Sequence, residues 1–388
     1  MPRRLTGKSM KIGILTFHFA CNYGAVLQTL ALKRTLEQLG AAVDVIDYLP
    51  QELQIPSARN GWGLWCPGQP GQLGNAGLRI RRAPFFKREF DTFRKKHLSL
   101  SKRCRTLDEV GAVAEQYDAI IAGSDQIWHF SRSPVYFLEW GSHYDGLRIS
   151  YAPSCAYPGQ SAGENANIKR WIRQIDSLSV RDNFSRDMIQ EVSGRIPEVV
   201  ADPTLLADLS DLQQPVNLPF KEYILMYALG ESVAGWADRV VPAIRRRVGN
   251  LPVVAVVSSI TNPRPCPCAD VVLWKASPEQ WMYLIKHAAF VFTDSFHGVL
   301  FAAKARRPLL AGFLEKGRAP RLMDLAVRYR LEDVIASSKE EAVRKIEMEP
   351  FCYEEATRLM HTHAEQSIRF LRTALAGRSS AQPPQLKV

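Results

Sequence analysis

Short apolar runs alternate with longer segments of helical periodicity through most of this chain, and this alternation constrains the fold more than any other feature. Near the start, a predicted strand at 11–17 is followed by apolar residues at helical spacing over 25–39 and by a predicted strand at 43–48. This order predicts a βαβ unit. Further strands are predicted at 119–122, 148–151, 177–180, 198–200, 223–227, 253–257, 290–292 and 309–311. Because the runs are apolar throughout, we expect an α/β fold with buried parallel strands.

Length and one proline-containing segment predict two domains. The 388 residues exceed one average domain, and 46% of them are hydrophobic. Residues 208–219 are the predicted linker. The predicted parts are an N-terminal Rossmann-like domain at 10–206 with an insertion at 50–100, a C-terminal Rossmann-like domain at 218–340, a helix at 341–376 and a disordered tail at 377–388.

A Gly/Pro-rich passage at 50–84 is too long for an ordinary connection, and it contains Trp62 and Trp65. Two interpretations stay open. The tryptophans pack onto the domain as part of a surface excursion, or they stack against sugar rings as a lid on the acceptor side.

The charge balance favours an anionic partner. Fifty Lys and Arg residues against 39 Asp and Glu residues give a net charge of +11, which suits a phosphorylated small substrate or an anionic membrane surface. No basic run is interleaved with aromatic residues in the way that single-strand binders require, and no zinc-finger or RNP spacing appears, so nucleic acid is ranked last among the partners.

The cysteines and apolar runs predict the compartment. Seven mostly isolated cysteines are unlike a disulfide framework and favour a reducing cytoplasm. The apolar run at 12–20 behind a basic start imitates a signal peptide, but the amphipathic segment after it predicts the first strand of a mature chain that begins near Met10. No window reaches the ~18 apolar residues of a membrane span, so contact with the inner face of a membrane is expected to be peripheral.

Polar residues gather directly after four predicted strands, at 17–25, 122–128, 179–183 and 293–298. Ligands of open α/β sheets bind where strands end and helices begin, because the free N–H groups of helix N-termini lie there. These four segments therefore form the candidate site.

The segment Thr-Asp-Ser-Phe-His-Gly at 293–298 gives the strongest signal. Asp294 and Ser295 are good helix caps, so His297 and Gly298 fall at a helix start, where an anion can bind. Histidine transfers protons near neutral pH, and glycine lets a ligand approach the backbone. The alternative is structural: a capping aspartate and an internally hydrogen-bonded histidine.

Arg181 ends an apolar strand. It either pairs with a neighbouring carboxylate, Asp182 or Asp187, or grips a substrate carboxylate or phosphate. A basic cluster follows His297 and comprises Lys304, Arg306, Arg307, Lys316, Arg318 and Arg321. Part of it completes an anion pocket, or its charges are simply solvated at the surface.

The remaining two segments carry hydrogen-bonding groups. Asn22, Tyr23, Ser124 and Gln126 are candidates for binding sugar hydroxyls, and Asp125 is a candidate carboxylate base. Turn formation explains the same residues equally well. A metal site is not expected, because the one Cys-Pro-Cys run has no second pair or histidine cluster at ligand spacing.

Together these segments resemble the polysaccharide pyruvyl transferase family. The resemblance covers roughly residues 11–335, and it is specific because several short motifs recur in one order. They are Asn-Tyr-Gly-Ala-Val-Leu-Gln-Thr from Asn22, Tyr-Asp-Ala-Ile-Ile-Ala-Gly-Ser-Asp-Gln-Ile-Trp from Tyr117, Ile-Ser-Tyr-Ala-Pro-Ser from Ile149, Ser-Val-Arg-Asp from Ser179, Asp-Pro-Thr-Leu-Leu from Asp202 and Thr-Asp-Ser-Phe-His-Gly from Thr293.

The resemblance implies two Rossmann-like domains that face a cleft, a GT-B-like arrangement. It also implies phosphoenolpyruvate as the donor and a ketal between pyruvate and two hydroxyls of a sugar. The sugar would belong to a cell-surface polysaccharide or its lipid-linked precursor, as in exopolysaccharide biosynthesis for the cell envelope. No metal or organic cofactor is implied.

By motif, the family's donor-site histidine falls on His297 and its Ser-x-Arg arginine on Arg181. Some relatives have Asp-Arg-Leu-His before the glycine, with the arginine holding the donor, whereas this chain has Ser295 there. We expect Arg318 or Arg321 to supply the missing cation.

The expected mechanism assigns the donor carboxylate to Arg181 and the donor phosphate to the helix start at Ser295, His297 and Gly298. His297 protonates the donor methylene, and Asp125 takes the proton of the attacking hydroxyl. Two other functions stay open. One is a GT-B glycosyltransferase that uses a nucleotide sugar, although no acidic residue is clearly placed for a ribose diol. The other is a noncatalytic protein that binds glycan or lipid phosphate, which the serine at position 295 leaves possible.

Overall fold

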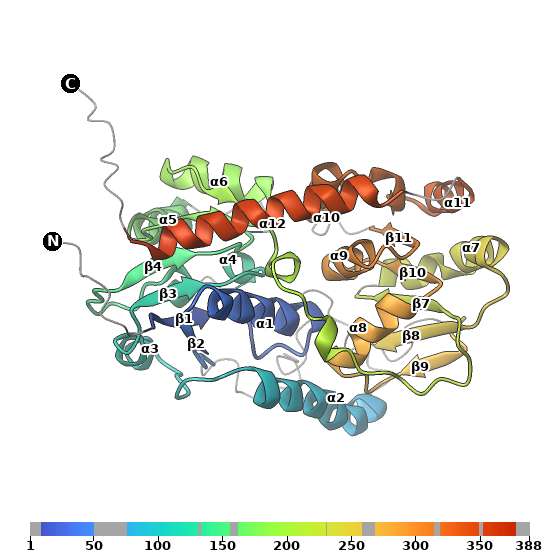
Figure 1. The fold of residues 1–388 in the computed structure, drawn as a ribbon, viewed down its shortest axis with the longest axis horizontal. Helices are drawn as coiled ribbons and strands as arrows, with labels where there is room; N and C mark the ends of the chain where they lie inside the picture. Colours follow the sequence, from blue (N-terminus) through green and yellow to red (C-terminus); the bar gives the residue numbers. More distant parts are fainter. Residues whose placement is uncertain are drawn as a thin grey trace.

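The structure is a computed structural model that describes residues 9–49, 76–130, 133–155, 162–229, 231–257, 268–313, 319–348 and 352–377. These residues form two α/β halves that lie side by side, each built on a parallel sheet (Figure 1).

The first half is built on four parallel strands in the order β2-β1-β3-β4. A bridge between Ile149 and Ser177 continues this sheet into the short parallel pair β5-β6. The strands are β1 (Lys11–Leu15), β2 (Ala42–Val45), β3 (Ala119–Ala122), β4 (Leu147–Ser150), β5 (Ser179–Val180) and β6 (Glu198–Val199). The helices are α1 (Tyr23–Gln38), α2 (Ala76–His97), α3 (Leu107–Ala114), α4 (Ile127–Phe130), α5 (Ala162–Arg173) and α6 (Asn183–Ser193).

The second half is built on six parallel strands in the order β12-β11-β10-β7-β8-β9. The strands are β7 (Ile224–Ala228), β8 (Val253–Val257), β9 (Val271–Leu273), β10 (Phe290–Thr293), β11 (Leu309–Gly312) and β12 (Ile335–Ala336). The helices are α7 (Glu231–Val248), α8 (Pro278–His287), α9 (Phe296–Lys304), α10 (Ala319–Tyr329) and α11 (Lys339–Glu347).

The central strands of both sheets confirm the predicted alternation, because a strand covered on both faces must be apolar throughout. Strands β9 and β12 were not predicted. Both lie at the edges of the second sheet. β9 is a partly buried run of three residues and β12 has two residues, so each leaves only a short apolar run in the sequence.

The predicted helix at 341–376 is wrong, since two helices occupy this region. Helix α11 ends at Glu347, and α12 (Glu354–Leu375) follows. Pro350 falls between them, and proline lacks the N–H that a helix interior requires. Helix α12 then runs back across both halves (Figure 1), where the Ser367 hydroxyl accepts a hydrogen bond from the Ala201 amide at 2.8 Å.

The predicted loop at 50–84 is also too long. Helix α2 begins at Ala76 and therefore takes up the end of this passage. Its first turns contain two alanines, three arginines and one leucine, whose helix propensity outweighs the single Pro84. Trp62 and Trp65 lie outside the described residues, so their two interpretations stay open.

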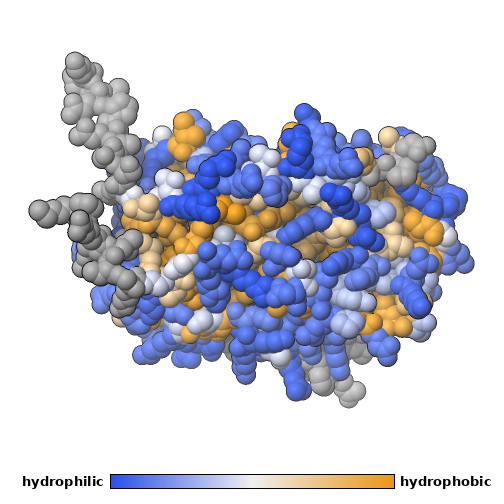
Figure 2. Space-filling model, viewed as in Figure 1, coloured by the Kyte–Doolittle hydropathy of each residue, from blue (hydrophilic) through white to orange (hydrophobic). Residues whose placement is uncertain are grey.

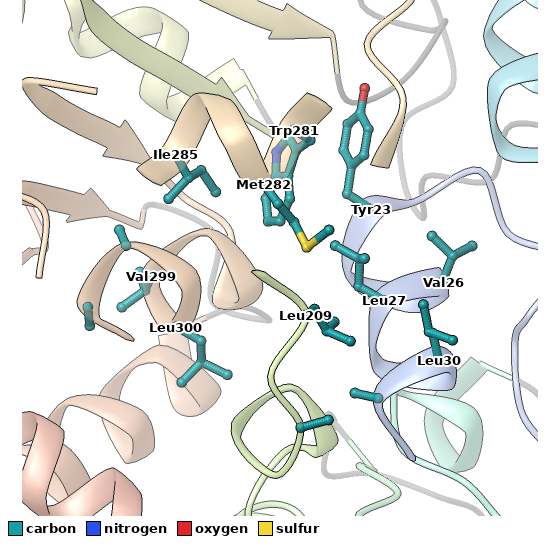
Figure 3. Packing of buried hydrophobic residues seen from close by; sticks show 14 of the residues in the cluster. Tyr23, Val26, Leu27, Leu30, Leu209, Trp281, Met282, Ile285, Val299 and Leu300 are labelled. Atoms are coloured by element: carbon teal, nitrogen blue, oxygen red, sulfur yellow. The ribbon is translucent and has the colours of Figure 1, made fainter. Parts of the chain in front are cut away.

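One hydrophobic core runs across both halves and holds them together (Figure 3). Tyr23 of α1 stacks on Trp281 of α8, with ring centroids 5.3 Å apart and an angle of 3° between the ring planes. The Tyr23 hydroxyl also donates a hydrogen bond to the Ala276 carbonyl at 3.0 Å. Further contributions come from α1, α8, α9 and the connecting segment, namely Val26, Leu27, Leu30, Leu209, Met282, Ile285, Val299 and Leu300. This packing brings the start of α1 against the start of α9.

Candidate functional site

The carboxylate of Asp202 lies at the centre of a buried polar cluster between the two halves. Its Oδ2 atom accepts hydrogen bonds from Arg181 Nη1 at 2.9 Å and from Ser124 Oγ at 3.4 Å. His297 Nε2, from the second half, lies 3.3 Å from the same oxygen. The Oδ1 atom accepts from the amide and the hydroxyl of Thr204, at 3.0 and 2.7 Å. One carboxylate thus joins three of the four segments predicted from the sequence.

The topology explains why these residues meet. Ser124 follows β3, Arg181 follows β5 and Asp202 follows β6, so all three leave the carboxyl ends of parallel strands in one half. His297 is the second residue of α9, directly after β10 of the other half. Carboxyl ends of parallel strands share one edge of a sheet, and ligands of α/β folds bind at that edge.

Burial and charge keep Asp202 ionised. Asp202 is 2% exposed, Arg181 is 4% exposed and His297 is 7% exposed. Burial by itself raises the pKa of the Asp202 carboxyl, but the charges of His297 and Arg181 and several hydrogen bonds hold that pKa well below its usual range. With His297 protonated, two cations face a single carboxylate, and the cluster carries an excess positive charge.

Three nitrogen atoms of this cluster have no hydrogen-bond partner among the described residues. They are Arg181 Nε, Arg181 Nη2 and His297 Nε2, the last of which is near Asp202 but outside hydrogen-bond geometry. Arg181 Nε and Nη2 form one edge of the guanidinium, and such an edge matches the two oxygens of a carboxylate or phosphate. Buried donors without partners are costly, so the cluster suits an anionic ligand.

The sequence and the fold agree with a known family and a known architecture. The family model described as "Polysaccharide pyruvyl transferase" matches residues 22–311, a stretch that contains Asp202, Arg181 and His297. The chain belongs to the polysaccharide pyruvyl transferase family. No curated protein matches it significantly.

Solved structures that resemble this pyruvyl transferase family member share its fold at low sequence identity. A putative UDP-N-acetylglucosamine 2-epimerase from Listeria monocytogenes has a TM-score of 0.50 and 13% identity, over 98% of this chain and 100% of that one. Arabidopsis thaliana UGT89C1 complexed with UDP-L-rhamnose has a TM-score of 0.51 and 13% identity, over 96% and 99%. UDP-GlcNAc 2-epimerase from Methanocaldococcus jannaschii has a TM-score of 0.50 and 11% identity, over 94% and 100%. These likenesses confirm the predicted GT-B-like α/β fold.

Ser295 is the N-cap of α9. Its hydroxyl accepts a hydrogen bond from the Gly298 amide at 3.2 Å. The Ser295 amide in turn donates to Thr293 Oγ1 at 3.1 Å. A Cβ atom at Gly298 would lie 2.6 Å from that Thr293 oxygen, so the turn needs glycine there. Ser295 and Gly298 therefore shape the first turn of α9.

Arg321, one of the two candidates for the missing cation, reaches the segment after β3. The Gln126 side chain faces it, and the amide oxygen, in its accepting orientation, lies 3.0 Å from Arg321 Nε. Gln126 thus contacts the second half of the molecule. The other candidate, Arg318, lies outside the described residues.

Arg181 does not pair with either carboxylate that the sequence suggested. Asp182 caps α6, where its Oδ1 accepts from the Ser185 amide at 2.8 Å. Asp187 pairs with Arg186 at 2.8 Å. The partner is Asp202, because β5 and β6 are adjacent parallel strands and the residues after them lie side by side. The ring of Phe296 packs against the Arg181 guanidinium, with Arg181 Cζ 4.5 Å from the ring centroid. This contact fixes the plane of the guanidinium.

The first predicted segment reaches the site through Gly24. A Cβ atom at this position would overlap the ring of His297 at Nδ1. Asn22 caps α1, its side chain accepting from the Ala25 amide at 3.1 Å. Tyr23, predicted to bind acceptor, is fully buried and hydrogen-bonded within the core, so it offers no surface to a sugar. Its burial follows from the packing of α1 on α8, which the local sequence does not specify.

Asp125, the predicted base, is held in an unusual conformation. Its φ of +88° lies in the left-handed region, which is strained for a residue other than glycine. Its carbonyl accepts from the Ser154 amide at 2.8 Å, and its side chain is partly exposed beside Ser124. A strained, partly exposed carboxylate next to a buried polar cluster is typical of a functional residue.

The residue that sequence reasoning missed is Asp202. It stands in the motif Asp-Pro-Thr-Leu-Leu directly after a predicted strand, and that position was the available signal. Among the described residues, no group of His, Cys, Asp and Glu side chains could hold a metal ion. None of the helices within the described part is long and apolar enough to cross a bilayer.

Proposed function

We propose that this protein transfers pyruvate from phosphoenolpyruvate to a sugar of a cell-surface polysaccharide or its lipid-linked precursor, as a ketal. The observation that carries the proposal is the pair of buried side chains with unpartnered nitrogen atoms, Arg181 and His297, which the Asp202 carboxylate holds in place. Phosphoenolpyruvate carries a carboxylate and a phosphate on the same carbon, C2, and these match two separate anion-binding groups.

In the proposed complex, the free edge of Arg181 binds the donor carboxylate through Nε and Nη2. The first turn of α9, shaped by Ser295 and Gly298, receives the phosphate through the amides of Phe296 and His297, because the Gly298 amide already donates to the Ser295 hydroxyl. Arg321, from α10, remains our candidate for a second cation on the phosphate. The donor methylene then lies toward His297.

The reaction adds one proton to the methylene carbon of phosphoenolpyruvate and removes one proton from each of two sugar hydroxyls. Protonated His297 gives a proton from Nε2 to the methylene, which becomes the methyl group of pyruvate, and C2 becomes electrophilic. A sugar hydroxyl adds to C2 and gives its proton to Asp125. The bond between C2 and the phosphate oxygen breaks, and a second hydroxyl adds to C2 to close the ketal. Of the two hydroxyl protons, one leaves with phosphate and one restores His297. Asp202 keeps the His297 ring in place throughout.

On the acceptor side, Asp125 remains our candidate base, and the hydrogen-bonding segments around Asn22 and Gln126 remain candidates for positioning the sugar. The proposed chemistry uses phosphoenolpyruvate as a substrate and no resident cofactor. A cytoplasmic location and peripheral contact with an anionic membrane remain predictions.

A nucleotide-sugar glycosyltransferase is the second candidate. A GT-B-like neighbour is complexed with UDP-L-rhamnose, which shows that the fold accommodates such a donor in that protein. The cluster around Asp202 favours a small anion, because a guanidinium edge beside a helix start matches the carboxylate and the phosphate of phosphoenolpyruvate.

Phosphate release from phosphoenolpyruvate, measured with a panel of pyranosides and lipid-linked sugars, tests the proposal. Arg181→Ala and His297→Ala should each lower the rate by at least about a hundredfold. Matched controls are Arg186→Ala and His361→Ala, whose side chains are exposed on α6 and α12. Full activity of both folded site variants would refute the assignment. Thermal stabilisation by UDP-sugars without any phosphate release would favour the glycosyltransferase, and binding of glycan without turnover would favour a noncatalytic protein.

A further inference from the structure

The outward face of α2 and the loop after it form a basic surface away from the Asp202 cluster. Between residues 87 and 105 the chain has eight Lys or Arg residues against two acidic ones, Glu89 and Asp91. Helix α2 lies along the lower edge of the molecule in Figure 1, and Figure 2 shows this edge as largely hydrophilic. We call this stretch, residues 87–105, the α2 basic surface.

The helix separates its apolar and basic sides cleanly. Phe86, Phe90 and Phe93 are buried against the rest of the molecule. Arg88 and Lys95, seven residues apart, are exposed on the opposite side. A spacing of seven residues is close to two helical turns, so these cations lie in one stripe. The hydrophobic side anchors the helix, and the basic side stays available.

Half of the cations on this surface form no ion pair within the described part of the chain, although a hydrogen bond from the Arg105 amide, and then the charges of Arg105 and Lys102, help to lower the pKa of nearby Glu109. Lys87, Lys96 and Arg103 pair with carboxylates, at 3.2, 4.0 and 2.8 Å. Arg94 is buried and pairs with Asp91 at 2.6 Å. The exposed cations outside every ion pair are Arg88, Lys95, Lys102 and Arg105.

Two basic residues of α7, in contrast, each pair with a carboxylate. On α7, Arg246 pairs with Glu347 at 2.6 Å and Arg245 with Asp270 at 3.1 Å. Unpaired exposed cations of one sign repel one another, and a large anionic surface relieves that repulsion.

We propose that the α2 basic surface docks this protein on an anionic phospholipid bilayer. Bilayer head groups form an extended negative layer without fixed geometry, and such a layer suits flexible cations spread along a helix. Leu100 and Leu107, 36% and 37% exposed, follow the basic stripe and add apolar contacts at the interface. Docking would bring the protein to a lipid-linked acceptor in the same bilayer, and this benefit rests on the proposed function. Binding to the bilayer itself does not depend on the proposed function.

Sedimentation of the full chain with vesicles tests the proposal without donor or acceptor. Vesicles of phosphatidylcholine with phosphatidylglycerol should bind the protein at low salt and release it at high salt, whereas pure phosphatidylcholine should not bind it. Each cation replaced on the surface should lower the partition coefficient about fivefold, so the double variant Arg88→Gln/Lys95→Gln should lower it about 25-fold. Both positions are exposed and unpaired, so the variant should fold normally.

A matched double variant separates a specific surface from the overall positive charge. Lys169→Gln/Arg170→Gln removes two exposed cations from α5 and should bind vesicles like the wild type. Equal losses in both variants, or an unchanged partition of Arg88→Gln/Lys95→Gln, would overturn the proposal. Tighter binding to duplex DNA than to vesicles would also overturn it and would make the surface a nucleic-acid site. Loss of vesicle binding with normal phosphate release separates this surface from the proposed reaction.

Discussion

Asp202 of the first half and His297 of the second half meet at 3.3 Å, with the carboxylate oxygen Oδ2 facing the imidazole nitrogen Nε2. The same oxygen accepts a hydrogen bond from Arg181 at 2.9 Å. One buried carboxylate therefore positions the two cations that we assign to the donor, and the site exists only when the two halves are docked.

Asp202→Asn should lower kcat for phosphate release by about 10²–10⁴-fold, because the amide keeps the shape of the carboxylate but not its charge. Arg181 and His297 would then repel each other without a counter-ion between them. Steady-state kinetics with phosphoenolpyruvate measures the effect, and Asp187→Asn on the exposed side of α6 is the control. A folded Asp202→Asn enzyme with the wild-type kcat would remove Asp202 from the site.

Gly24→Ala should abolish activity while secondary structure is kept, because the added Cβ overlaps the His297 ring. Either the ring moves away from Asp202 or the two halves separate locally. Gly235→Ala on α7 is the control, since nothing lies within 4 Å of its added Cβ. Circular dichroism and phosphate release measure the two properties. Equal activity of the two variants would mean that the start of α1 does not restrict His297.

Trp281→Ala should destabilise the protein by about 3–5 kcal/mol, since it removes a fully buried indole that stacks on Tyr23. The core spans both halves, so calorimetry of the wild type should show a single unfolding transition. Met348→Ala, at a side chain that is 54% exposed, should change stability by less than about 0.5 kcal/mol. Two separate transitions in the wild type would show that the halves unfold independently.

The stability of the wild type should fall in acid partly through Asp202. The charges around this carboxyl hold its folded-state pKa below the unfolded value of about 3.9, so its stabilisation is complete above that value and is lost as the pH falls through the folded-state pKa. Denaturation by urea from about pH 7 to about pH 3 should therefore show the wild type approaching Asp202→Asn in stability. A stability difference between the wild type and Asp202→Asn that grows as the pH falls would contradict this explanation.

Local rules in the sequence predicted much of the fold. Fully apolar runs marked the central strands because both faces of a parallel strand are buried. Ser295 is a cap because a serine hydroxyl satisfies a free N–H group at a helix start, and this follows from residues three positions apart. The edge strand β9 was missed because a short, partly buried strand leaves only a short apolar run. The break near Pro350 was missed because a single proline was its only signal.

The sequence by itself thus determined a βα alternation and placed Arg181 and His297 at the ends of strands. Tertiary structure alone decided their partners. Arg181 and Asp202 are 21 residues apart in the chain, and Tyr23 and Ala276 are 253 apart, so neither contact is visible in any local pattern. The physical reason is that a buried ion pair depends on which strands are neighbours and how two separate sheets dock, and both are set by packing of the shared core.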